Sequence, residues 1–297
     1  MKITCPNPKC VLALNLGPRS RRIVRNGSFF RASDSQWIQK FHCRMCSCYF
    51  SAATFSPRYL QKARRINVPL FNMLNSGVSL RRSAMILGVN RKTVVRRFRF
   101  LGEQARSQHL KWLENFKKHP LAEVQFDDLE TSEHTKCKPL SVSLAVEPIH
   151  RKILYFEVSQ MPCKGKLARI ALIKYGKRKD KRPAGWDRLM VALKPILQPR
   201  ATLTSDDNPH YPKFVKGHHP TAKHITVKGG RGCISGQGEL KKLRFDPLFS
   251  LNHTCAMLRA NLNRLFRRTW CLIIPHISRR SMIEIGCSWN NFHPTSI

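Results

Sequence analysis

Acidic residues are scarce in this chain. Its 297 residues include 17 Asp and Glu against 54 Lys and Arg, which gives a formal net charge of +37. Self-repulsion of this size opposes a compact fold unless a polyanion neutralises it. The composition therefore predicts nucleic acid as the main partner. A ribosomal role and binding to a membrane surface are the alternatives.

Long apolar runs are also missing. No stretch reaches the roughly 20 apolar residues that a helix needs to cross a bilayer. The first residues, MKITCPNPKC, do not show the basic segment followed by an apolar segment that is typical of a secretory signal peptide. We therefore expect an intracellular protein with no membrane segment, long enough for two or three domains.

Cysteine is more frequent, and its placement is informative. In an intracellular chain, 11 cysteines indicate metal ligation or free thiols before disulfides. Cys5 and Cys10 form one pair, and Cys43 and Cys46 form a second. Paired thiolates at such spacing suit tetrahedral zinc. Cys48, two residues further on, is an alternative ligand, and ordinary reduced thiols are the alternative interpretation.

The segment between the two cysteine pairs has the pattern of a short β-ribbon. RRIVRNGSFFR and WIQKFHC are strand-like, and Asn26-Gly27 is a signal for a tight turn. In so small a module a bound metal would supply most of the folding free energy. Residues 1–58 are therefore predicted to be a zinc-ribbon module that binds DNA.

Residues 59–112 have the pattern of a helix-turn-helix domain with a linker helix. One helix is expected to start at Ser79 and to end before the tight turn Gly88-Val89-Asn90, where Asn90 can cap the next helix, RKTVVRRFRFL. The linker helix, EQARSQHLKWLENFKKHPL, ends at Pro120. The apolar residues expected to face inward are Leu70, Phe71, Leu74, Ala84, Ile86, Leu87, Val94, Val95 and Phe98.

The second helix of this pair is strongly basic. Its first exposed residues, Arg91, Lys92 and Thr93, would approach base edges in a DNA groove. Arg96 and Arg97 would hold phosphates. The alternative is a plain helical hairpin with a solvated charged face.

Residues 113–297 are predicted to form a mixed α/β domain. Its strand pattern begins beyond Pro120, after the end of the linker helix. Three strand-like runs come first, AEVQFDDLET, KPLSVSLAVEP and RKILYFEVSQMP, and are expected to form an antiparallel meander. Two helices follow, KLARIALIKYGKRKDKR and GWDRLMVALKPIL, then strands in ATLTSDDNPHY and AKHITVK, a glycine-rich loop and a last helix. This order predicts a ribonuclease-H-like mixed sheet with helices.

Two pairs of acids stand at strand ends of this domain. Asp127-Asp128 lie in the first strand, where alternation turns them to opposite faces, and Asp206-Asp207 end a later strand. If the two strands are neighbours, one carboxylate from each can meet. Such oxygens bind hard cations such as Mg²⁺ or Mn²⁺, and a pair of these ions promotes phosphoryl transfer on nucleic acid. The alternative is that each pair caps a turn or strand end.

The last helix, DPLFSLNHTCAMLRANLNRLFRRTW, begins a stretch without acids, since no Asp or Glu occurs from Leu248 to Ile283. Its basic residues Arg259, Arg264, Arg267 and Arg268 are predicted to face phosphates. Its apolar stripe is predicted to pack on the sheet and consists of Leu251, Cys255, Leu258, Leu262 and Leu265.

In their order along the chain, these motifs resemble a known family. C-x4-C, IVRNG, FHC-x2-C, a helix-turn-helix with LGVN, FDDLET and LTSDD together look like bacterial insertion-sequence transposases of the insertion-sequence-one class. RANLNRLFRRTWC is similar to the basic segment R-x3-RL-x-R-K/R-T-x-C of that class. The resemblance covers residues 5 to about 271. It implies a ribonuclease-H-like domain, divalent-metal DDE chemistry, and binding to terminal inverted repeats and target DNA. Homo-oligomers on DNA, in the bacterial cytoplasm at the nucleoid, are the further expectation.

The resemblance also assigns catalytic positions. Asp127 matches the first acid of the family and Asp206 the second. The third acid of the family opens the last helix, where this chain has Asn252 followed by His253. An amide oxygen can ligate a hard cation without adding charge, and Glu239 in the loop GQGELKK is the rival carboxylate.

The departure at the third acid leaves other interpretations open. One is a decayed transposase or a repressor that only binds DNA, and another is a different ribonuclease-H-like nuclease, such as a junction resolvase. The tail CLIIPHISRRSMIEIGCSWNNFHPTSI shows neither a helical stripe nor strand alternation. It is therefore predicted to be a degenerate or frameshifted end.

Overall fold

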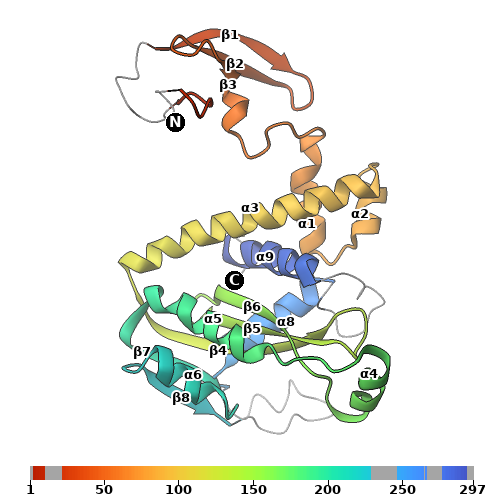
Figure 1. Ribbon diagram of the computed structural model, residues 1–297, viewed down its shortest axis with the longest axis vertical. Helices are drawn as coiled ribbons and strands as arrows, with labels where there is room; N and C mark the ends of the chain where they lie inside the picture. Colours follow the sequence, from red (N-terminus) through yellow and green to blue (C-terminus); the bar gives the residue numbers. More distant parts are fainter. Residues whose placement is uncertain (1–2, 11–21, 229–245, 264, 266–275, 293–297) are drawn as a thin grey trace. The chain divides into compact units, whose positions relative to one another are not determined.

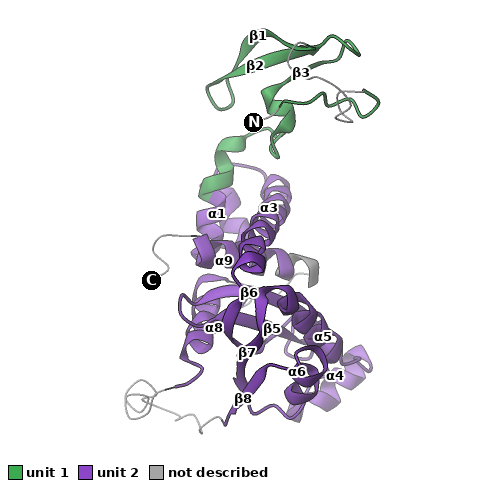
Figure 2. Cartoon of the chain, turned by 90° about the vertical axis from the view of Figure 1, so that its left-hand side faces the viewer, with its two compact units in different colours: residues 1–69 green, residues 70–297 purple. Residues whose placement is uncertain are grey.

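The computed structural model describes residues 3–10, 22–228, 246–263, 265 and 276–292. The chain forms two compact units, residues 1–69 and 70–297 (Figure 2). The boundaries predicted at 58 and 112 differ from this division, since residue 112 falls inside a helix that runs from Arg91 to Lys118. Within the described ranges, no helix is long and apolar enough to cross a membrane.

The first unit is built on a three-stranded antiparallel sheet, β1 (Ile23–Arg31), β2 (Gln36–Cys43) and β3 (Tyr49–Ser51). Two short 3-10 helices follow, η1 (Ala52–Phe55) and η2 (Arg64–Ile66).

The tight turn predicted at Asn26-Gly27 is wrong. These residues lie inside β1, where the register with β2 shifts between Arg25 and Ser28. Gly27 has a φ of 68°, a conformation that both a hairpin turn and a β-bulge can require, so the dipeptide did not distinguish them. The chain instead reverses at residues 32–35, beyond the end of β1.

Three helices come next along the chain, α1 (Asn67–Asn75), α2 (Leu80–Ile86) and α3 (Arg91–Lys118). From Leu70 on they belong to the second unit. The Ser79 hydroxyl accepts a hydrogen bond from the Arg82 N–H at 3.3 Å, so α2 starts where predicted. The Asn90 side chain accepts one from the Lys92 N–H at 2.8 Å, which confirms the predicted cap of α3. The turn between them contains Gly88 with a φ of 61°.

Burial in these helices follows the prediction except at one position. The predicted inward residues Leu70, Leu74, Ala84, Val94 and Phe98 are buried, and Phe71, Leu87 and Val95 are partly buried. Ile86 is 63% exposed, so its predicted inward position is wrong. The buried side of α2 is formed by Leu80, Ser83 and Ala84, at helical spacing, and this turns Ile86 away from the core.

The main sheet has five strands in the order β6-β5-β4-β7-β8 (Figure 1). They are β4 (Leu121–Ser132), β5 (Pro139–Glu147), β6 (Lys152–Gln160), β7 (Leu197–Asp206) and β8 (Lys223–Val227). β4, β5 and β6 form the predicted antiparallel meander, whereas β7 lies parallel to β4 and β8 parallel to β7. The mixed α/β class and all five predicted strands are confirmed.

Three helices connect the later strands. α4 (Ala168–Tyr175) and α5 (Arg182–Leu193) lie where helices were predicted, and the short η3 (Gly165–Leu167) and η4 (Lys194–Ile196) adjoin them. α6 (Tyr211–His218) was not predicted, because only its first residue lay in the predicted strand segment ATLTSDDNPHY and residues 212–218 were assigned to no element. The proline in its first turn was the signal for a helix start.

The helix predicted over residues 246–270 begins later and ends earlier, as α8 (Phe249–Asn261). Part of its predicted continuation lies outside the described residues. Of its apolar stripe, Leu251, Leu258, Leu262 and Leu265 are buried and Cys255 is partly buried.

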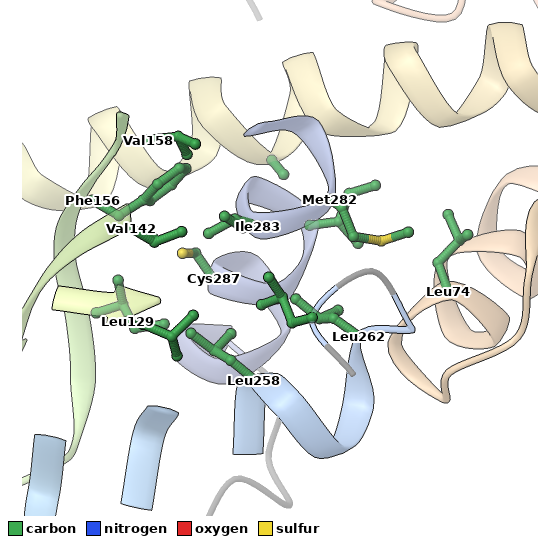
Figure 3. Packing of buried hydrophobic residues seen from close by; sticks show 14 of the residues in the cluster. Leu74, Leu129, Val142, Phe156, Val158, Leu258, Leu262, Met282, Ile283 and Cys287 are labelled. Atoms are coloured by element: carbon green, nitrogen blue, oxygen red, sulfur yellow. The ribbon is translucent and has the colours of Figure 1, made fainter. Parts of the chain in front are cut away.

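The prediction of a degenerate tail is wrong over residues 276–292. These form a regular helix, α9 (His276–Phe292), that packs between α3 and the sheet (Figure 3). Side chains 282–288 are all buried, and among them Glu284 is held by an ion pair with Arg280 at 3.3 Å. A side chain at Gly102 of α3 would come within 2.7 Å of Ser281, which shows how closely the two helices approach.

α9 is also joined to the edge strand β6 by hydrogen bonds. The Asn291 side chain accepts from the Ile153 N–H and donates to the Ile153 carbonyl, both at 2.9 Å. Asn290 donates to the Arg151 carbonyl at 2.9 Å, and Lys152 donates to the Asn290 carbonyl at 3.0 Å. The C-terminal helix is therefore a specific part of the second unit.

The sheet has a hydrophobic core on each face. Val124 and Phe126 of β4 pack with Trp186 of α5 and Tyr211 of α6 on one face. Leu129 of β4 packs on the other face with residues of α3, α8 and α9. This arrangement confirms the alternation predicted for β4 and places its two aspartates toward different surroundings.

Candidate metal centre and acidic site

The four paired cysteines of the first unit come together. The Sγ atoms of Cys5 and Cys46 lie 3.5 Å apart and those of Cys10 and Cys43 3.8 Å apart, and all four lie within 4.8 Å of one another. Four thiolates at about 2.3 Å from one tetrahedral zinc ion would be about 3.8 Å apart, so the donor set fits zinc. Cys48 lies outside the group, and its thiol contacts the Tyr49 carbonyl.

The thiols of Cys5 and Cys46 share a hydrogen bond, and their pKa values shift in opposite directions. Burial raises the pKa of the Cys5 thiol well above its ordinary value. Burial acts in the same direction on Cys46, but hydrogen bonds from the Cys48 N–H and from Cys5 outweigh it and lower its pKa to about 7. One thiolate is thus already favoured before a cation binds, and a cation replaces the remaining protons.

The two predicted catalytic acids also come together. β4 pairs with β7 in parallel register, with Phe126 opposite Ser205, so Asp127 and Asp206 follow on adjacent strands. Burial, and after it the charge of Asp206, raise the pKa of Asp127 to about 7. Burial likewise raises the pKa of Asp206, against a hydrogen bond from the Asn208 N–H, and the charges of Asp128 and Asp207 raise it further.

Asp128 has a different role from its neighbour. Its carboxylate accepts hydrogen bonds from the Ser143 hydroxyl at 2.6 Å and from the Trp186 indole N–H at 3.0 Å. Burial raises its pKa, and these two donors oppose the shift. Asp128 therefore ties β4 to β5 and α5, and Asp127 remains for the site.

The sequence did not single out Tyr211, which α6 brings to the acids. Its hydroxyl donates to Asp127 Oδ1 at 3.3 Å, and burial together with the carboxylates raises its pKa. The neutral phenol is therefore a donor held at the first acid. On the other side of the site, His224 of β8 hydrogen-bonds the Ser205 hydroxyl at 2.9 Å, one residue before Asp206.

Of the groups predicted to be the third ligand, Asn252 and His253 have other contacts in the structure. The Asn252 amide donates to Asp246 at 2.9 Å, and His253 lines a separate cavity with Arg151 and Trp289. Glu239 lies outside the described residues.

Cys255 of α8 lies close enough to Asp127 for its thiol to be affected by the charge of that carboxylate. The Leu251 N–H donates to Gln125 Oε1 at 3.0 Å, which aligns α8 with β4. One turn further on, burial and the charge of Asp127 raise the pKa of Cys255 to about 12. Among the described residues, the four-cysteine cluster is the only group of three or more side chains with metal-binding geometry.

The basic residues predicted to contact DNA are distributed as follows. Arg91, Lys92 and Arg96 of α3 are exposed, whereas Thr93 and Arg97 are half-buried. Arg259 of α8 is half-buried and donates to the Glu130 carbonyl at 3.4 Å. Arg264, Arg267 and Arg268 lie outside the described residues.

The fold and the site define a mixed α/β protein with a four-cysteine cluster and an acidic pair on adjacent parallel strands. No model of a known protein family matches the chain, and no curated protein sequence matches it either.

Proposed function

We propose that the protein is a DNA transposase that cleaves and joins strands with divalent metal ions held by Asp127 and Asp206. The observation that carries the proposal is the placement of these two carboxylates on adjacent parallel strands. Raised pKa values on both are the signature of acids crowded together in a site from which water is partly excluded. A divalent cation relieves that repulsion and can activate an attacking water or 3′-hydroxyl.

Further support comes from the sheet itself. Three antiparallel strands followed by two parallel ones, in the order β6-β5-β4-β7-β8, is the arrangement expected of a ribonuclease-H-like domain. The motifs FDDLET and LTSDD also resemble those of insertion-sequence transposases, and that resemblance implies catalytic roles for the same two acids. The net charge of +37 fits a polyanionic substrate.

The remaining parts of the chain have roles in the same proposal. Zinc bound by Cys5, Cys10, Cys43 and Cys46 holds the first unit together. The exposed basic start of α3 binds duplex DNA at the terminal inverted repeats, with Arg91 and Lys92 near base edges.

Strand cleavage in the presence of Mn²⁺ tests the proposal on DNA that carries the inverted repeats flanking the coding sequence. Asp127→Asn and Asp206→Asn should each lower cleavage about 100-fold or more, because each removes a charged metal ligand. Asp207→Asn is the matched control, since Asp207 is adjacent and exposed, and it should retain activity. Cleavage that survives both site substitutions would exclude this active site.

A second candidate function is DNA binding without cleavage, as in a repressor or an inactive transposase. It is favoured by the surroundings of α8, where Asn252 is engaged with Asp246 and a thiol, Cys255, lies beside Asp127. Specific binding to the inverted repeats with no Mn²⁺-dependent cleavage would support this function over the first.

Duplex binding by the helix-turn-helix can be measured separately. Arg96→Ala should weaken binding and lower the slope of log K against log salt by about 1, because it removes one phosphate contact. Lys92→Ala should weaken binding to the inverted repeats more than binding to other sequences, because it removes a contact to base edges. Lys117→Ala is the control on the same helix, since Lys117 is paired with Glu114 at 2.7 Å. Equal losses in all three variants would contradict a localised contact surface.

A further inference from the structure

The first compact unit has an almost uniform positive charge. Residues 1–69 contain 13 Lys and Arg and a single acid, Asp34. That acid is already neutralised, since Arg31 donates to it through two hydrogen bonds of 2.6 Å and Arg64 lies 3.7 Å away. The unit therefore attracts polyanions and presents no acidic partner of its own.

The hairpin of β1 and β2 carries an exposed aromatic pair near its tip. Phe30 and Trp37 are opposite each other in the strand register, and their ring centroids are 5.6 Å apart. Trp37 is 72% exposed and Phe30 is 52% exposed. Tryptophan is highly buried on average in folded proteins, so an exposed pair of this size indicates a binding surface.

The hairpin holds the pair in a defined place. Backbone pairing continues to the last residues of both strands, with Arg31 opposite Gln36. The ion pair between Arg31 and Asp34 joins the end of β1 to the turn at residues 32–35. The two rings are thus displayed on a preorganised support, which lowers the entropic cost of binding.

We propose that Phe30 and Trp37 stack on unpaired bases of single-stranded nucleic acid, while the exposed Arg25, on the same face of the hairpin, contacts its phosphates. Aromatic rings stack on the face of any base, and basic residues follow the backbone. A duplex hides its base faces inside the stack, so it can engage the charges but not the rings. The inference is independent of metal chemistry at Asp127 and Asp206, which belong to the other compact unit.

The test is the binding of zinc-loaded full-length protein to a fluorescent 12-nucleotide thymine oligomer and to a 12-base-pair duplex. Trp37→Ala should weaken binding to the single strand about 5- to 100-fold, the cost of one lost stacking contact, and should leave duplex binding nearly unchanged. Trp37→Phe should restore most of the affinity, because it keeps an aromatic face. An unchanged zinc content establishes that each variant is folded.

Tyr49→Ala is the matched control. Tyr49 belongs to the same sheet and is 67% exposed. It pairs with His42 and stacks on its ring. Because His42 is five residues from Trp37 along β2, alternation places His42 and Tyr49 on the face opposite Trp37. Tyr49→Ala should leave binding to the single strand nearly unchanged. Single-strand affinity that is unaffected by Trp37→Ala, or that falls equally in Tyr49→Ala, would overturn the proposal. An equal loss on duplex and single strand would overturn it as well.

Discussion

Cys43→Ser is expected to unfold the first compact unit and to release its metal. Zinc bound by four cysteines contributes about 10–16 kcal/mol of apparent free energy in small domains, more than the small core around Phe41 and Phe50 can supply. Zinc content per chain, measured by a colorimetric chelator, should fall from about one to about zero, and β1–β3 should become sensitive to protease.

The matched control for this result is Cys48→Ser. Cys48 is close in sequence but lies outside the four-thiol group, so this variant should keep its zinc. Zinc retained in Cys43→Ser, or lost in Cys48→Ser, would show that the ligand set is different. The second unit has its own cores and should remain folded in either variant.

Asp127→Asn is expected to stabilise the metal-free protein at neutral pH, although it removes a ligand of the proposed divalent-metal site. In the folded state the pKa of Asp127 is raised from 3.8 to about 7. The folded state therefore holds a proton that the unfolded state has released, and stability falls as pH rises from about 4 to about 7. At pH 7.5 the substitution should increase the free energy of unfolding by about 1–3 kcal/mol. This range is smaller than the free energy equivalent of the whole pKa shift, because the carboxyl group is partly hydrated.

Thermal unfolding at several pH values measures this effect. The difference between wild type and Asp127→Asn should disappear below pH about 4, where both states carry the proton. Mn²⁺ should raise the unfolding temperature of wild type and not that of the variant, since only the wild type offers the anionic ligand. A variant less stable than wild type at pH 7.5 would mean that the carboxylate stabilises the fold and is not held there for a cation.

The sequence was most informative where one face of an element is buried and the other is not. β4 alternates between two cores, so its residues and the opposite directions of Asp127 and Asp128 were predictable. Cysteine spacing was equally informative, because thiolates that bind one ion must fold back to a common point.

Prediction was poorer where burial has no periodicity or where two conformations share a signature. α9 is enclosed by α3, α8 and the sheet, so polar residues such as Glu284 and Asn291 are buried beside its apolar ones, and the expected contrast between a polar and an apolar face was not recognised. Asn26-Gly27 suits both a turn and a bulge. Tyr211 was missed because α6 is short and directly follows a strand. The position of Cys255 beside Asp127 depends on the alignment of α8 with β4, which sequence pattern does not determine.

The central claim is that Asp127 and Asp206 together bind a divalent cation. The most direct measurement is Mn²⁺ binding to the zinc-loaded full-length chain by electron paramagnetic resonance at pH 8, above the pKa of about 7 for Asp127. Wild type and Asp207→Asn should bind with affinities within about twofold of each other, and Asp206→Asn should bind at least about 10-fold more weakly. Equal Mn²⁺ affinity in wild type, Asp206→Asn and Asp207→Asn would contradict the account.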